Sequence, residues 1–359
     1  YDSQGVRDVT VWCGVDYLGL SQHPHLKAIM RQAIQEFGIG AGGTRNIGGN
    51  IHQHILLEQA LSKLHQKHAA LLFTSGYIAN EVTIKTLGKL IPNLTFFSDQ
   101  QNHMSIVEGI RESNSRKVIF AHNDLNDLEL KLADLPIEAP KIIVFESVYS
   151  MSGTIAPVKA IVALAKKYHA LTYIDEAHAI GVYGAHGGGV TELTQTAKDI
   201  DIIQGTLSKG LGLIGGYISG TDAFVDALRL HANGFIFTTS LPPQIAITAL
   251  AALAMVSEIQ ALQLQLFKIV TYVKTALLNA GFNILAATSK SQIIPLWIGD
   301  PSLCESISQR LLNEFNMYIQ PINYPTVRRG QECFRISPTA KHTEDDAHRL
   351  IAALKICLL

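Results

Sequence analysis

Short apolar runs rich in β-branched and aromatic residues alternate with segments of helical periodicity along the first two thirds of the chain. The apolar runs predict strands at 70–74, 95–98, 118–121, 142–146, 171–175, 202–205 and 214–219. The helical patterns predict helices at 26–37, 51–67, 77–89, 103–114, 126–134 and 157–169. Strands that alternate with helices imply right-handed crossovers, so we expect an α/β fold with a large, doubly wound, mostly parallel sheet.

Beyond Pro243 the rhythm changes. A long helical stretch over 244–280 precedes a strand near 293–298, a helix near 302–315, short strands near Tyr318 and Phe334, and a last helix from Thr343. This pattern predicts a second, smaller α+β domain. The expected division is a truncated N-terminal segment at 1–20, a large cofactor-binding domain at 21–253 and a small C-terminal domain at 254–359.

Composition narrows the class of protein. Apolar residues make up 47% and charged residues 16% of the 359 positions, which excludes disorder for most of the chain. The net charge of −1 gives no basic footprint for nucleic acid and no attraction to an anionic membrane. Mean hydropathy is +0.19, yet the longest apolar stretch, Ile245 to Ser257, is too short to span a membrane and predicts a buried helix.

The four cysteines contain no CxxC pair, so a disulfide scaffold and a zinc ribbon are both disfavoured. Reduced thiols in the cytoplasm, or in the mitochondrial matrix of a eukaryote, are the expectation.

The most informative stretch is LTYIDEAHAIG at 171–181, where an apolar strand ends in Asp175 and His178 follows. Ligands of open α/β sheets bind beyond the carboxyl ends of the strands, so both side chains are expected at a site. DEAH also occurs in helicases, but these need a GxxxxGK[ST] loop, and this chain has none. A strand-end aspartate that only caps a helix remains an alternative.

Lys209 lies in the turn QGTLSKGLGLIGG at 204–216, after the next apolar strand. Lysine is mostly a surface residue, and a desolvated lysine becomes a competent amine nucleophile. Pyridoxal phosphate enzymes need a Schiff-base lysine and an aspartate on the pyridinium nitrogen. Lys209 with Asp175 fits that need, whereas Lys209 alone could be an ordinary loop lysine.

Two further sequence features are compatible with this cofactor. Ser75, Gly76 and Tyr77 join a strand to a helix, whose N-terminal N–H groups could hold a phosphate, with Thr206 adding a hydroxyl. A plain N-cap explains the same residues. His103 follows another strand and could lie over a ring face, although a lone histidine is more often structural.

The glycine run GIGAGGTRNIGG at 38–49 follows a helical pattern instead of a strand, which excludes a dinucleotide-binding loop. We interpret it as a flexible loop whose polar tip, Thr44-Arg45-Asn46, lines a cleft. Four histidines at 52, 54, 65 and 68 suggest a metal, but no carboxylate pattern accompanies them, so a helix surface is favoured and no metal is expected.

Over its whole length the chain resembles the α-oxoamine synthases, fold-type I pyridoxal phosphate enzymes that condense an amino acid with an acyl-CoA and release CO2. The segments that carry the resemblance are VWCGVDYLGL (11–20), GGTRNIGGN (42–50), FESVYSMSGTIAP (145–157), YIDEAHAIGVYG (173–184), GFIFTTSLPP (234–243), PINYPTVRRG (321–330) and FRISPTAKHT (334–343). TRN and NYPTV make it most similar to the branch that condenses glycine with succinyl-CoA to 5-aminolevulinate.

The resemblance implies roles around the cofactor. Lys209 would carry it as a Schiff base and take the glycine Cα proton, and Asp175 would pair the pyridinium nitrogen. His103 would stack on the ring, and His178 would bond its phenolic oxygen. The remaining implied cofactor contacts are Ser150 and Thr206 and, reaching the phosphate of the neighbouring subunit in a homodimer with shared active sites, Thr238 and Thr239.

The resemblance also implies substrate contacts. Ser98, Lys117 and Thr326 would face acyl-CoA. Thr44 and Asn46 would face the succinyl carboxylate, and Arg335 would pair the glycine carboxylate through a bidentate contact. The chain departs from the family at Val15, where the motif usually has an asparagine that helps to hold the amino-acid carboxylate.

The expected function is therefore the first step of tetrapyrrole (heme) biosynthesis. Other acyl-CoA condensing enzymes of the family remain alternatives: 8-amino-7-oxononanoate synthase, 2-amino-3-ketobutyrate ligase, or a secondary-metabolite or autoinducer synthase. An alternative of another class is a catalytically silent homologue that scaffolds a partner, which the intact set of Lys209, Asp175, His178 and His103 disfavours.

Overall fold

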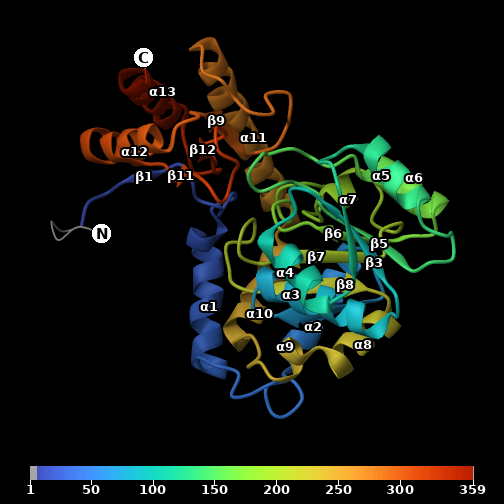
Figure 1. The fold of residues 1–359 in the computed structure, drawn as a ribbon. Coiled ribbons are helices and arrows are strands. Elements are labelled where there is room, and N and C mark those ends of the chain that lie inside the picture. Colours follow the sequence, from blue (N-terminus) through green and yellow to red (C-terminus); the bar gives the residue numbers. More distant parts are fainter. Residues whose placement is uncertain (1–5, 359) are drawn as a thin grey trace. The chain divides into compact units, whose positions relative to one another are not determined.

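The computed structural model describes residues 6–358, and the chain divides into two compact units. The larger unit comprises 19–149 and 155–260, and the smaller comprises the N-terminal segment to Leu18, the short segment 150–154 and everything from Ala261 onwards. Figure 1 shows the blue N-terminal segment among the orange and red elements of the smaller unit. Each unit is therefore built from stretches that are distant in sequence.

A seven-stranded sheet forms the centre of the larger unit, in the order β2-β8-β7-β6-β5-β3-β4. The strands are β2 (Ala69–Phe73), β3 (Thr95–Asp99), β4 (Arg116–Phe120), β5 (Lys141–Glu146), β6 (Leu171–Asp175), β7 (Ile202–Thr206) and β8 (Gly216–Gly220). All neighbouring pairs are parallel except β8, which runs antiparallel to β2 and β7. The predicted mostly parallel, doubly wound sheet is confirmed, and β8 is the exception because no crossover helix separates it from β7.

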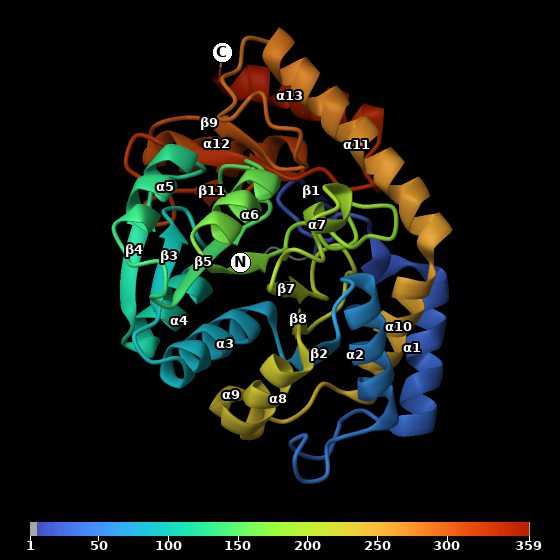
Figure 2. The ribbon, with the colours of Figure 1, turned by 90° about the vertical axis from the view of Figure 1, so that its right-hand side faces the viewer.

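Helices cover both faces of this sheet (Figure 2): α3 and α8 lie on one side and α5 and α6 on the other. The helices of the larger unit are α1 (Pro24–Phe37), α2 (His52–Leu64), α3 (Gly76–Leu90), α4 (Met104–Ser113), α5 (Leu125–Ala133), α6 (Val158–Lys167), α7 (Val190–Leu193), α8 (Asp222–His231), α9 (Asn233–Ile236) and α10 (Pro243–Ala254), preceded by a 3-10 turn at Leu20–Gln22. Ile84, Ile106, Phe96, Tyr173 and Ile218 are fully buried between helices and strands. Because both faces are covered, the central strands are almost continuously apolar, which is why their sequences predicted them well.

The smaller unit contains a three-stranded antiparallel sheet, β11 (Pro321–Ile322), β12 (Cys333–Ile336) and β9 (Ile294–Trp297), with α12 (Pro301–Phe315) and α13 (Glu344–Leu358). A second ladder joins β1 (Thr10–Val11) in parallel to β10 (Met317–Tyr318). The predicted strands and helices beyond residue 290 are thus present.

The helical stretch expected over 244–280 is confirmed and consists of two helices, because the backbone leaves the helical conformation at Met255, where α10 ends and α11 (Val256–Asn279) begins. Among residues 6–358 no single helix is long and apolar enough to cross a membrane, and only the bent pair of α10 with α11 reaches that length and composition together.

Candidate active site

A cavity of about 250 Å³ opens at the carboxyl ends of β5, β6 and β7 in the larger unit. Its walls come from the starts of α3 and α4, the ends of these strands and the turn after β7. The lining residues are Ser75, Gly76, Tyr77, Asn80, His103, Ser105, Glu146, Asp175, Ala177, His178, Gln204, Thr206, Ser208 and Lys209. Eight predicted cofactor residues therefore share one cavity: Lys209, Asp175, His178, His103, Ser75, Gly76, Tyr77 and Thr206.

Asp175 ends β6 and is held on both carboxylate oxygens by neutral donors. Asn80 Nδ2 donates to Oδ2 at 2.7 Å, and the backbone N–H of Ala177 donates to Oδ1 at 2.7 Å. The hydroxyl of Tyr173 donates to Asn80 Oδ1 at 2.7 Å and so fixes the amide. No cation is among these donors, so the charge of Asp175 is left for a cationic ligand in the cavity.

His103 is the N-cap of α4 and faces the same cavity. Its Nδ1 lies 2.8 Å from Ser105 Oγ, and that hydroxyl also accepts from Asn80 Nδ2 at 3.0 Å. Removal of the imidazole from water lowers the pKa of His103, Asp175 opposes this and Lys209 adds to it. The ring is therefore neutral at pH 7 and can pack on an aromatic face without repelling the cation of Lys209.

The N-terminus of α3 forms a close-fitting corner of the cavity. Ser75 caps the helix by accepting from the N–H of Ile78 at 3.2 Å. A Cβ added at Gly76 would lie 3.0 Å from Gln204 Nε2 and 3.2 Å from Thr206 Cβ, so glycine is the residue that fits this space. The helix cap is therefore confirmed, and the same residues form a wall of the cavity, while the binding of a phosphate there stays a prediction.

Lys209 and His178 complete the cavity from two turns. Lys209 is partly buried in the turn after β7, and His178 is 5% exposed in the turn after β6. In the same turn as Lys209, Thr206 Oγ1 donates to the carbonyl of Gly215 at 2.8 Å and lies 2.9 Å from Ser208 Oγ. The ends of the strands and the turns after them thus place an amine, a carboxylate and two imidazoles in the same cavity.

These residues fit pyridoxal phosphate. An amine for a Schiff base, a carboxylate with neutral partners for a ring nitrogen, and a glycine-lined helix N-terminus for a phosphate all face a single cavity. Glu146 Oε1 is a buried oxygen with no hydrogen-bond partner among the described residues, as expected where a ligand supplies one.

Thr238 and Thr239 do not line this cavity. They line a small separate one, of about 20 Å³, with Thr74 and Ser240. The backbone of Thr239 bridges that of Thr44, and the N–H of Ser240 donates to the carbonyl of Gly43 at 3.0 Å. The glycine-rich loop is therefore joined to segment 238–240 within the protomer.

Arg45 corrects the interpretation of the loop tip as a polar cleft lining. Its side chain is buried and binds both carboxylate oxygens of Glu58 on α2, at 2.7 and 3.0 Å, and Nε donates to Asn50. Arg229 and the N–H of Leu72 also donate to Glu58. A guanidinium this deep needs a carboxylate partner, so Arg45 points inwards while the neighbouring Asn46 stays exposed.

The favoured helix-surface position is wrong for two of the four histidines. His54 and His65 are fully buried, His54 with Nε2 2.7 Å from the carbonyl of Leu241 and His65 with Nε2 2.8 Å from the hydroxyl of Tyr217. His52 and His68 are exposed. The spacing of the four histidines did not show that His54 packs against the segment after α9 or that His65 packs against β8.

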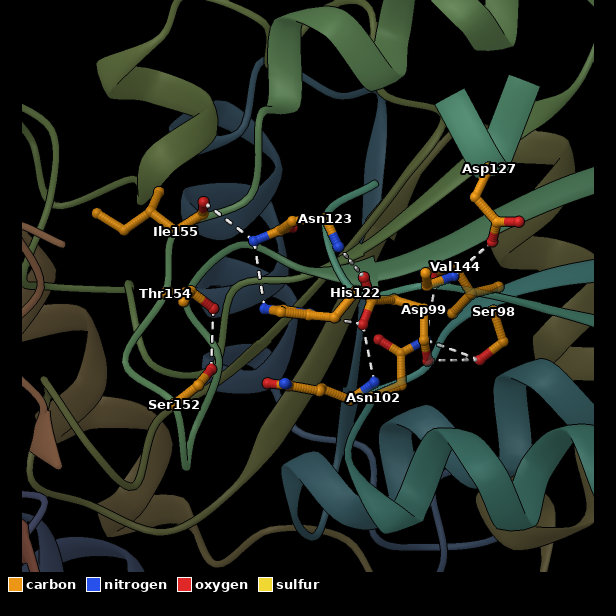
Figure 3. A network of polar contacts seen from close by, with 12 residues as sticks. Ser98, Asp99, Asn102, His122, Asn123, Asp127, Val144, Ser152, Thr154 and Ile155 are labelled. Carbon is orange, nitrogen blue, oxygen red and sulfur yellow. Dashed lines mark hydrogen bonds and ion pairs between the residues drawn. The ribbon is translucent and has the colours of Figure 1, made fainter. Parts of the chain in front are cut away.

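Ser98 lies at the end of β3 in a polar network that includes Asp99 (Figure 3). Asn102 Nδ2 donates to Ser98 Oγ at 2.9 Å and to the carbonyl of Val144 at 2.8 Å. His122 Nδ1 lies 2.9 Å from Asp99 Oδ1. Ser98 is buried, whereas the predicted acyl-CoA residue Lys117 is exposed on the neighbouring strand β4.

Arg335 lies on β12 in the smaller unit. Ser150 and Thr326 belong to the same unit but lie on other segments. Its two terminal nitrogens make only long contacts, 3.4 Å to the carbonyl of Ser150 and 3.5 Å to that of Cys13, and its buried Nε has no partner among the described residues. A partly buried guanidinium with a buried, unused Nε donor suits a carboxylate ligand. Thr326 is exposed on the segment before β12.

The sequence analysis missed several cavity residues: Asn80, Ser105, Glu146, Gln204 and Ser208. Asn80 had a usable signal, because it lies four residues after Gly76 and therefore on the same face of α3. Glu146 also had one, since it follows the apolar run 142–145 in β5, next to the strand that ends in Asp175.

Comparison with known proteins agrees with this geometry. The profile of the aminotransferase class I and II family matches residues 7–354. The chain is 48% identical over 354 residues to 5-aminolevulinate synthase of Rhizobium meliloti (strain 1021), covering 99% of this chain and 87% of that protein. It is 48% identical over 338 residues to the mitochondrial 5-aminolevulinate synthase of Schizosaccharomyces pombe, covering 94% and 60%. The structure of Sphingomonas wittichii serine palmitoyltransferase superposes with a TM-score of 0.93 at 31% identity, over 98% of this chain and 87% of that one.

Proposed function

Since the chain belongs to the aminotransferase class I and II family, and within it to the α-oxoamine synthases, we propose that it condenses glycine with succinyl-CoA to give 5-aminolevulinate, CoA and CO2. The observation that carries the proposal is the meeting of Lys209, Asp175 and His178 with the N-terminus of α3 in one cavity. The product is the precursor of heme, so the reaction is the first step of tetrapyrrole biosynthesis.

Pyridoxal phosphate, when bound, supplies the electron sink that stabilises negative charge on the glycine Cα. Lys209 holds the cofactor through its amine and takes the Cα proton. Asp175, fixed by Asn80, keeps the ring nitrogen protonated by a charge-assisted contact. Ser75, Gly76, Tyr77 and Thr206 hold the phosphate, His103 packs on the ring, and His178 donates to the phenolic oxygen.

The substrate contacts are proposals of the same kind. Arg335 pairs the glycine carboxylate, which its unused Nε supports. Thr44 and Asn46 bind the succinyl carboxylate, Ser98, Lys117 and Thr326 face the CoA moiety, and Ser150 contacts the cofactor. The compartment, cytoplasmic or the mitochondrial matrix of a eukaryote, is supported by four cysteines that are all free.

A coupled assay of CoA release tests the reaction. Glycine with succinyl-CoA should give the highest kcat/KM among glycine, alanine and serine paired with several acyl-CoAs. Lys209→Ala should abolish both turnover and the trapping of cofactor by borohydride, whereas the exposed control Lys159→Ala should keep both. A preference for a long-chain acyl-CoA would assign another member of the family, and cofactor trapped on Lys209→Ala would remove the Schiff-base role.

We also propose a homodimer in which Thr238 and Thr239 serve the partner's cofactor. Their position outside the protomer's own cavity supports this. Mixing Lys209→Ala subunits with Thr238→Ala/Thr239→Ala subunits should restore part of the activity, because one hybrid site is intact. No recovery in dimers that are shown to exchange subunits would contradict the shared site.

A further inference from the structure

Glu146 is a second carboxyl group that lines the cavity, and the proposed reaction gives it no role. It ends β5, and its Cα partner across the ladder is Asp175 at the end of β6. The side chain lines the cavity and is 2% exposed, and its Oε1 has no hydrogen-bond partner among the described residues. An unpaired buried carboxyl oxygen is costly in a folded protein unless a ligand pairs with it.

The surroundings of Glu146 favour its neutral form. Burial is the largest influence, and the neighbouring Asp175 adds to it, so the pKa of Glu146 lies well above its usual value. Lys209 and the backbone N–H of His103 oppose this shift, and Asp99 reinforces it. Tyr149 and His178 are the other titratable groups nearby, and burial also holds the pKa of Tyr149 well above its usual value.

Glu176, the next carboxyl along this edge, shows what a purely structural glutamate does here. It is fully buried, and burial raises its pKa too. However, its two oxygens accept from the N–H groups of Thr191 at 2.7 Å and Val190 at 3.0 Å, at the start of α7. Glu176 does not line the cavity, so it is fully used by the fold, whereas Glu146 is not.

We propose that Glu146 lies in the cavity as a neutral carboxylic acid and, beside His178, donates a second hydrogen bond to the phenolic oxygen of bound pyridoxal phosphate. The ring is the target because Glu146 is paired in register with Asp175, the ring-nitrogen partner, while the phosphate is served by the α3 corner. The inference rests on the proposed function. A neutral acid can donate where an ionised one can only accept, so the protonation state decides the contact.

The pH dependence follows from the sign of the shift. Below its raised pKa Glu146 is protonated and donates, and as the pH rises through that pKa the donor is lost and a second negative charge forms beside Asp175. The visible absorption of the bound cofactor should therefore change as the pH rises through that raised pKa, and this change, called the alkaline step below, belongs to Glu146.

Three variants of the holoenzyme test the proposal: Glu146→Gln, Glu146→Met and, as the matched control, Glu176→Gln. The readouts are the Kd of pyridoxal phosphate for the apo form and the visible spectrum from neutral to alkaline pH. Glutamine keeps a neutral donor, so Glu146→Gln should bind the cofactor within a few-fold of wild type and lack the alkaline step. Methionine fills the space without a donor and should weaken binding about 10-fold or more.

Glu176→Gln should keep the alkaline step even where its melting temperature falls. The proposal is overturned if Glu146→Gln weakens binding as much as Glu146→Met, because the charge would then matter, or if all variants match wild type, because Glu146 would then not touch the cofactor. A wild-type protein that binds no pyridoxal phosphate would instead refute the proposed function, so the two failures are distinguishable.

Discussion

Asp175 and Glu58 are two carboxylates of the larger unit that are equally buried, each 4% exposed, and yet differently used. Glu58 is surrounded by the guanidinium groups of Arg45 and Arg229, which cancel its charge inside the protein. Asp175 accepts hydrogen bonds from two neutral donors, the amide of Asn80 and the N–H of Ala177, and it faces a cavity. A buried charge paired within the chain serves the fold, whereas one held by neutral partners is available to a ligand.

The largest effect should come from breaking the fully paired cluster. Glu58→Gln leaves Arg45 buried without its carboxylate, which should lower the free energy of unfolding by about 3–5 kcal/mol. Urea denaturation measures this. The exposed pair of Lys85 with Glu112 is the control, and Glu112→Gln should change stability by less than about 1 kcal/mol. Equal effects at both sites would contradict the comparison.

Asp175→Asn should lower turnover strongly and stability only slightly. It keeps the shape but removes the charge that the cavity holds for its ligand, so kcat should fall by about 10²-fold or more, while the midpoint of urea unfolding changes little. Steady-state kinetics measure the loss of turnover, and urea denaturation of the same variant measures any loss of stability. Near-normal turnover would show that the charge of Asp175 is not used by the reaction.

Arg335 has an Nε donor with no partner among the described residues, and its guanidinium donates to the carbonyl of Cys13. Val15 lies two residues after that cysteine. Val15→Asn restores the donor that the family usually has, and a hydrogen bond to a charged group is worth about 1.5–3 kcal/mol. The KM for glycine should therefore fall by about 10- to 150-fold. Glycine and alanine are titrated side by side, and an unchanged glycine KM would mean that residue 15 does not reach the substrate.

The smallest effect concerns His65, a buried group whose partner, Tyr217, is neutral as well. Burial lowers the pKa of His65 to about 3, from about 6.5 in the unfolded chain. Below pH 6.5 the unfolded state binds the extra proton, so stability falls as the pH drops, by about 1.4 kcal/mol per unit. His65→Gln keeps a donor for Tyr217 and should lose this part of the slope between about pH 6 and 4, unlike the exposed control His52→Gln. Parallel slopes for wild type and His65→Gln would refute the assignment.

The predicted cofactor residues that the structure brings into one cavity lie at the ends of strands or in the turns after them. Asp175, His178, His103 and Lys209 come after apolar runs, and parallel strands bring their carboxyl ends to one edge, so chain order alone implied a shared cavity. Ser105 was missed because a polar residue within a helix has no local signature of what it faces, whereas Asn80 could have been found from its spacing to Gly76. Arg45 and Glu58 escaped for another reason, since the pairing of a loop with a helix is decided by burial, which the hydrophobic pattern of a glycine-rich loop does not encode.

The parallel ladder of β1 with β10 has a consequence for how the chain folds. Thr10 pairs with Met317, roughly 300 residues later, so β1 leaves the ribosome long before its partner strand β10 is synthesised. Contacts between such distant residues close very large loops and slow folding, because the entropy of closure is lost before the contact forms. During synthesis β1 therefore remains unpaired while the seven-stranded sheet assembles. A chain stalled after residue 260 would hold a complete large sheet but no partner for β1.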